Sequence, residues 1–149
     1  GKVMLKSGAL NFEDGMLKSG EFVIDMTTIM VEDLQGNMRN KLEGHLKSAD
    51  FFNVEEHNTA MFKTTKVLPN GNEGEYKIIG DLTIKGITNE IKFYANVTEG
   101  DNSTMGKADI TIDRTEFDVR YGSNTFFGNL GNKTIYDDFD LTVNLVAKK

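Results

Sequence analysis

Residues 76–84 read Tyr-Lys-Ile-Ile-Gly-Asp-Leu-Thr-Ile, and this stretch decides the fold class of the 149-residue chain. Large apolar side chains recur there at alternate positions, namely Tyr76, Ile78, Leu82 and Ile84. Gly80 occupies the remaining position of that face, and Ile79 is the one apolar side chain on the other face. A period of two is typical of a strand with one buried face. The stretch therefore predicts a half-buried β-strand.

Similar alternation surrounds this strand on both sides. The turn at residues 85–88 leads into the alternating residues 91–97, which predicts a hairpin. A second hairpin is predicted from residues 10–12 to residues 22–27 through the turn signal Glu13-Asp14-Gly15. Further strands are predicted over residues 60–68, 104–112 and 138–147.

The first predicted strand changes its parity along its length. Val3 and Leu5 occupy odd positions, whereas Leu10 and Phe12 occupy even ones. A bulge near Ser7-Gly8 would keep all four side chains on the same side of the sheet. Bulges of this kind let the strands of a barrel curve.

Helical patterns are confined to short pieces of the chain. Met38, Leu42 and Leu46 follow the spacing of a helix and predict a short one over Asn37 to Ser48. Brief helical turns are predicted near Asp113, over residues 113–117, and near Asn124, over residues 124–130. About seven antiparallel strands without βαβ spacing indicate an all-β fold. Periodicity alone leaves a sandwich and an up-and-down barrel open.

Composition narrows the class of protein and of partner. The length of 149 residues suits a single domain, residues 1–149, with a real hydrophobic core. A net charge of −6 and the absence of a basic stripe argue against a nucleic-acid partner. The chain has no cysteine, so its fold does not depend on disulfides.

Residues 42–54 carry a longer motif. The run His45-Leu46-Lys47-Ser48-Ala49-Asp50-Phe51-Phe52-Asn53-Val54 resembles the H-L-x-S-x-D-F-F-x-V signature of the YceI family of lipid-binding barrels. Three more stretches agree with that family in order: Gly-Asp-Leu-Thr-Ile-Lys-Gly-Ile-Thr at residues 80–88, Ile112-Asp113-Arg114 with Phe117, and Leu-Thr-Val-Asn-Leu at residues 141–145. The resemblance therefore spans nearly the whole chain.

The resemblance implies a lipocalin-like antiparallel up-and-down β-barrel, eight-stranded in the family, with a helical segment packed against it. It also implies an interior tunnel for a polyisoprenoid, a quinone-like molecule or an acyl chain, in a periplasmic or secreted bacterial protein. Family members normally begin with a further strand, and this sequence starts after it. A barrel without that strand leaves an edge open, so either the strand belongs to the molecule or another chain completes the barrel. We expect the first, because truncated barrels seldom fold well.

We expect the lipid to contact the inward apolar faces of the strands and the apolar residues of the loop at 121–133. The predicted lining comprises Phe12, Phe22, Ile24, Met26, Phe62, Ile78, Leu82, Ile84, Ile91, Phe93, Ile110, Ile112, Phe126, Phe127, Leu141 and Val143. Gly80 interrupts an inward face where a packed core would want volume, which favours a cavity. The best donors for a polar head group at the tunnel mouth are Arg114, Arg120 and Tyr121.

Catalysis is not expected, and neither are a cofactor and a bound metal. Cysteine is absent, and His45 and His57 are the only histidines. We interpret His45 as a structural residue that holds the helix to the following loop, and His57 as solvated. An enzyme that uses His45 or Asp113 as acid or base stays an alternative. So does a ligand-free module that docks on a membrane redox protein through Phe126 and Phe127, and a homodimer stays open as well.

Overall fold

The computed structural model describes residues 1–123, 125–126, 128, 131 and 134–148. Seven strands dominate it, and each one covers a stretch that the sequence predicts as a strand. Their bounds are β1 Lys2–Glu13, β2 Met16–Met30, β3 Thr59–Pro69, β4 Glu75–Ile84, β5 Ile87–Glu99, β6 Ser103–Asp113 and β7 Asp138–Lys148. The helical elements are α1 at Gly36–Lys47 and the short 3-10 helix η1 at Arg114–Phe117.

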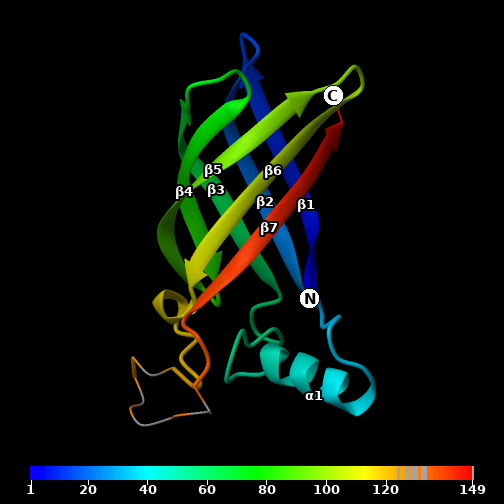
Figure 1. Cartoon of the computed structure of the whole chain (residues 1–149), viewed down its shortest axis with the longest axis vertical. Coiled ribbons are helices and arrows are strands. Elements are labelled where there is room, and N and C mark those ends of the chain that lie inside the picture. Colours follow the sequence, from blue (N-terminus) through cyan, green and yellow to red (C-terminus); the bar gives the residue numbers. More distant parts are fainter. Residues whose placement is uncertain (124, 127, 129–130, 132–133, 149) are drawn as a thin grey trace.

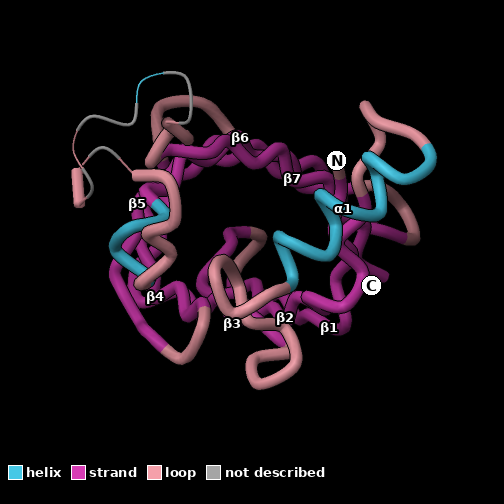
Figure 2. Tube along the Cα trace, turned by 90° about the horizontal axis from the view of Figure 1, so that it is seen from below, coloured by secondary structure: helices cyan, strands magenta, loops and turns pink. Residues whose placement is uncertain are grey.

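The seven strands form one antiparallel sheet in the order of the chain, β1 to β7. The sheet curls into a tall, nearly closed barrel, as Figure 1 shows from the side and Figure 2 from below. The barrel prediction is therefore confirmed, and the sandwich alternative is wrong. Strands β1 and β7 form the two edges of the sheet, and we call the line where they approach each other the seam.

Alternation decides which side chains enter the barrel. In β4 the residues Tyr76, Ile78, Leu82 and Ile84 are all buried, as their spacing predicts. The hairpin from β4 to β5 turns on Lys85 and Gly86, whose φ angles of 55° and 77° are left-handed. Positive φ at both central residues matches the twist of the two strands that the turn joins. The register then runs without interruption from Ile84 opposite Ile87 to Glu75 opposite Asn96.

The predicted bulge in β1 is present one residue earlier than expected. Leu5 lies opposite Ile24 and Ser7 lies opposite Val23, so Lys6 is the extra residue. A second irregularity falls where Asn11 pairs with Ser19 and Phe12 pairs with Leu17, which makes Lys18 the extra residue of β2. Bulges raise the local twist and help the two strands bend around the barrel.

Helix α1 lies below the barrel, across part of its lower end (Figures 1 and 2). A carboxylate joins it to the end of β2, because Glu43 Oε1 accepts the backbone N–H of Val31 at 2.9 Å. The predicted apolar face of this helix is only partly correct, since Met38 is 65% exposed and no residue of α1 is buried. No helix in the described part of the chain has the length and the apolar character needed to span a membrane.

Helix η1 confirms the helical turn predicted near Asp113. The Asp113 carboxylate accepts hydrogen bonds from the backbone N–H and the hydroxyl of Thr115. It thereby caps a donor that the short helix leaves unpaired. The helical turn predicted over residues 124–130 lies in part outside the described residues.

Candidate functional site

An apolar cavity of about 130 Å³ occupies the middle of the barrel. Inward side chains from all seven strands surround it, and only apolar surface faces it. A space without polar partners holds water poorly, because a buried water normally makes about three hydrogen bonds. The cavity is therefore suited to a hydrocarbon and not to a polar metabolite.

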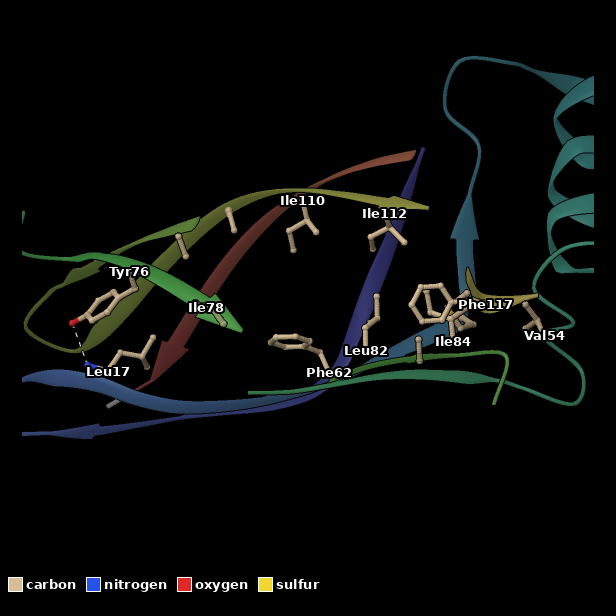
Figure 3. Close-up of a cluster of buried hydrophobic side chains, with 14 residues drawn as sticks. Leu17, Val54, Phe62, Tyr76, Ile78, Leu82, Ile84, Ile110, Ile112 and Phe117 are labelled. Atoms are coloured by element: carbon tan, nitrogen blue, oxygen red, sulfur yellow. Dashed lines mark hydrogen bonds between the residues drawn. The ribbon is translucent and has the colours of Figure 1, made fainter. Parts of the chain in front are cut away.

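Buried side chains lie toward both ends of the barrel interior (Figure 3). At the upper end, the hydroxyl of Tyr76 accepts a hydrogen bond from the backbone N–H of Leu17 at 3.1 Å. At the lower end, Phe117 is fully buried, and it packs in the same core cluster as Ile84 and Val54.

A phenylalanine ring fills the space beside Gly80. A Cβ atom at Gly80 would come within 2.6 Å of Phe62 Cζ and within 2.6 Å of the Lys63 carbonyl oxygen. The ring of Phe62 lies 5.4 Å, centroid to centroid, from the ring of Phe93. The expectation that Gly80 marks empty space is therefore wrong, because this glycine admits a neighbouring aromatic ring.

The structure brings most of the predicted lining together. The predicted residues that line the cavity are Phe22, Ile24, Phe62, Ile78, Leu82, Ile91, Phe93, Ile110, Ile112, Leu141 and Val143. Met26 and Ile84 are buried in the same core but do not line the cavity. Phe12 packs against that core and lines the seam groove instead of the cavity.

Two predicted lining residues come from the loop after η1. Phe126 is 44% exposed and stacks against the Arg120 guanidinium, whose central carbon lies 4.3 Å from the ring centroid. This placement contradicts a role in the lining. Phe127 lies outside the described residues.

Several lining residues were missed by sequence reasoning. Leu17 escaped because the bulge at Lys18 reverses the parity of β2. Ala108 and Gly106 share the inward parity of Ile110, but small residues give no apolar signal. Gly20 and Thr64 also share the inward parity of Phe22 and Phe62 but give no apolar signal, and Lys107 lines the cavity although its parity is outward.

Arg114 does not occupy the head-group position that was expected of it. Its side chain is 4% exposed, and its guanidinium donates to the carbonyl oxygens of Tyr136, Val119 and Ile135 at 2.9, 2.8 and 3.1 Å. Burial lowers the pKa of Arg114, while the nearby Asp137 and Asp113 carboxylates oppose that shift. The residue therefore supports the loops below the barrel and is not free to bind a ligand.

The other two head-group candidates lie on the same side of the molecule and are exposed. Arg120 Nε lies 3.2 Å from Asp118 Oδ1, in a surface ion pair. The Tyr121 ring stacks edge-on against His45, with 4.6 Å between ring centroids, and is 47% exposed. Neither residue lines the cavity.

His45 contacts aromatic rings and one carboxylate. Its Nε2 lies 3.6 Å from Asp50 Oδ2, and its ring packs edge-on against Phe51 at 4.7 Å between centroids. These contacts join α1 to the loop that follows it, as the structural interpretation requires. His57 is half-buried instead of fully solvated, since it lies beside the turn at Gly86. Neither histidine lines the cavity.

The acidic residues near β7 are engaged by hydroxyl groups. Asp137 accepts from the hydroxyls of Ser123 and Thr125, which lower the pKa of its carboxyl below the ordinary value. Asp140 Oδ1 accepts from Thr111 Oγ1 at 2.6 Å. Among the described residues, no three His, Cys, Asp or Glu side chains converge to form a group that could hold a metal ion.

Comparison with known proteins agrees with this architecture. The YceI-like domain family matches residues 1–147. A UPF0312 protein of Ectopseudomonas mendocina is 31% identical over 118 residues, which are 75% of this chain and 59% of that protein. A UPF0312 protein of Staphylococcus aureus strain N315 is 38% identical over 76 residues, which are 50% of this chain and 41% of that protein. The chain thus spans about half the length of these curated relatives.

Solved structures show the same fold at low sequence identity. The YCEI protein of Campylobacter jejuni superposes with a TM-score of 0.74 at 19% identity, over 99% of this chain and 84% of that chain. BcnA of Burkholderia cenocepacia gives a TM-score of 0.75 at 22% identity, over 95% of this chain and 82% of that chain. With a family match over residues 1–147 and a barrel of the same shape, the chain belongs to the YceI-like domain family.

Proposed function

We propose that this protein binds and carries a long apolar lipid, such as a polyisoprenoid, a quinone-like molecule or an acyl chain. The observation that carries the proposal is the cavity in the middle of the barrel, which offers apolar surface only. Membership of the YceI-like domain family supports it. We also propose a periplasmic or secreted location, where such a lipid would need a protein to shield it from water.

Energetics favour a long ligand over a short one. Burial of each methylene group contributes about 0.8 kcal/mol. Association costs roughly 4–15 kcal/mol in lost freedom of motion. A tail of about ten methylenes therefore only balances the middle of that range. Because the cavity supplies no polar anchor, a useful affinity requires a longer tail.

Carriage without chemical conversion fits the same geometry. A reacting bond must lie within hydrogen-bond reach of a general acid or base. His45 and Asp113 do not line the cavity, and the Asp113 carboxylate already binds Thr115. We therefore propose binding, and not catalysis, as the activity of the barrel.

Native mass spectrometry with a long-chain isoprenoid alcohol tests the proposal. The delipidated protein should gain the mass of one lipid when it is offered the alcohol. The variant Ala108→Phe should reduce this uptake, since Ala108 is 7% exposed and its side chain borders the cavity. A protein that always keeps its apo mass would refute the proposal.

A matched control places the same bulk on the outer face. Asn144 lies on the adjacent strand β7, is exposed, and does not line the cavity. The variant Asn144→Phe should take up the lipid as the wild type does. Equal loss of uptake in both variants would show that the central cavity is not the binding site.

A further inference from the structure

Strands β5 and β6 separate over the lower half of the barrel. Their ladder runs only from Glu99 opposite Thr104 to Ala95 opposite Ala108. Below it, the Asn89 side-chain amide donates to the Glu116 carbonyl oxygen at 2.6 Å and joins β5 to η1. Between these two joints, residues 90–94 and 109–113 have no ladder partner on each other's strand in the described structure. We call this opening the β5–β6 window.

The window lies beside the central cavity. A groove of about 780 Å³ lies over it on the outer face of the barrel. Phe93, Lys107 and Ala108 line both this groove and the central cavity. Continuing the register past Ala95 and Ala108 would place Phe93 level with Ile110, and both side chains border the cavity. The edges of the window are thus apolar toward the inside.

The outer rim of the window carries positive charge. Lys77, Lys92 and Lys107 line the groove, on three successive strands. Lys77 lies opposite Tyr94, so Lys92 is its diagonal neighbour on the outer face, at about 7–8 Å. Within the described part of the chain, none of the three ammonium groups lies within 4.0 Å of a carboxylate. This cluster occurs on a chain whose net charge is −6.

Three lysines line the groove, while Glu75, Asp81 and Glu90 share the outward parity of Lys77 and Lys92 on β4 and β5 without lining it. Asp109 is the one carboxylate among the described residues that line it, and it accepts a hydrogen bond from Thr142 Oγ1 at 2.8 Å. Like charges on neighbouring strands repel each other, and an anion between them relieves the repulsion. The seam groove between β1 and β7 also shares lining residues with the cavity, but two lysines line it, Lys6 and Lys148, together with Glu99.

We propose that the β5–β6 window is a head-group site for an anionic lipid, whose carboxylate or phosphate binds Lys77, Lys92 and Lys107 on the outer face. The tail passes between the two strands at Phe93, just below the last ladder pair of Ala95 and Ala108, and lies in the central cavity. Buried side chains, among them Tyr76 and Phe117, crowd the interior toward both ends of the barrel, and a passage through the wall gives the tail a shorter way in. This inference rests on the proposed lipid binding and adds the head-group class and its position.

Competition binding with palmitate and hexadecanol tests the inference on the full chain. The two probes share one alkyl tail and differ in the charge of the head. The double variant Lys77→Gln/Lys92→Gln should lower the affinity for palmitate, relative to that for hexadecanol, by about tenfold. The same ratio in the wild type should fall as salt is added, because the rim is exposed to solvent.

The control variant Lys63→Gln/Lys66→Gln removes the same charge from β3, where both side chains are exposed and border neither the groove nor the cavity. It should keep the wild-type ratio. An equal fall in both double variants, or no fall in either, would overturn the window as the head-group site. Failure of the wild type to bind either probe would instead refute the proposed lipid binding itself.

Discussion

Two glycines on the inward faces of strands, Gly80 in β4 and Gly106 in β6, should respond to alanine in opposite directions. In Gly80→Ala, the new Cβ would lie 2.6 Å from the Lys63 carbonyl oxygen and 2.6 Å from Phe62 Cζ. In Gly106→Ala, the nearest atoms would be Leu145 Cβ at 3.7 Å and Leu145 Cδ2 at 3.8 Å, which are ordinary contacts. Gly80 is buried beside Phe62, whereas Gly106 lines the cavity, so the two substitutions compare a filled inward position with an open one.

The magnitudes follow from two opposing terms. Alanine in a strand gains about 0.5–1 kcal/mol over glycine, because it loses less conformational freedom on folding. Overpacking costs about 1–3 kcal/mol, and at Gly80 one clashing atom belongs to the backbone ladder and cannot swing away. We therefore expect Gly80→Ala to lose about 1–2 kcal/mol of unfolding free energy and Gly106→Ala to gain about 0.5–1 kcal/mol.

Urea unfolding followed by circular dichroism measures both values. With a slope of about 1–3 kcal/mol per molar urea, the midpoints of the two variants should differ by roughly 1 M. Adding Phe62→Leu to Gly80→Ala should relieve the ring contact but not the contact with the Lys63 carbonyl, and a double-mutant cycle isolates that part. Shifts of the same sign and size in both alanine variants would refute the reasoning.

Three further predictions concern the lower end of the barrel and the loop after η1. Arg114→Met should destabilise the fold by about 3–5 kcal/mol in thermal melts, because three carbonyl oxygens lose their donor, whereas Arg120→Met should change it by less than about 0.5 kcal/mol. The pKa of Asp137 is lower in the folded protein than in the unfolded chain, so its carboxylate stabilises the fold fully at pH values above the unfolded-state pKa. This stabilisation is lost as the pH falls through the folded-state pKa. In Asp137→Asn, the urea midpoint should therefore decrease less steeply with falling pH below about pH 4 than in the wild type. The same pH dependence in both proteins would contradict this. Phe126→Ala should take up lipid as the wild type does in native mass spectra, since the Phe126 ring lies outside the cavity. Reduced uptake would show that Phe126 contacts the lipid.

Side-chain parity made the strands and most of the lining predictable. A strand has a fixed period, so one buried residue such as Ile78 determines which neighbours point inward. Parity fails where a bulge intervenes, and Leu17 was missed for that reason. Parity also does not indicate where two neighbouring strands separate. The β5–β6 window therefore became visible only from the hydrogen-bonded pairs of the two strands in the structure.

The remaining errors concern contacts between segments far apart in the chain. Arg114 binds carbonyl groups of residues 119, 135 and 136, and no local pattern announces that arrangement. The sequence of β4 alone predicts an empty space at Gly80, but the Phe62 ring of the adjacent strand β3 fills that space. Exposed Phe126 shows that an aromatic residue in a loop can stack on a surface arginine instead of entering the core.

The uncrossed order of the strands has a consequence for how the barrel folds. Turns of a few residues join β1 to β2 and join β3, β4, β5 and β6 in series, whereas residues 31–58 and 114–137 separate the remaining neighbours. Closing a loop costs more entropy as its length grows, by about 2 kcal/mol between the short and the long connections here. We expect the β3–β6 meander to assemble first as a cooperative unit. The β1–β2 hairpin and β7 then dock onto its two sides, and the cavity acquires its walls only in that last step.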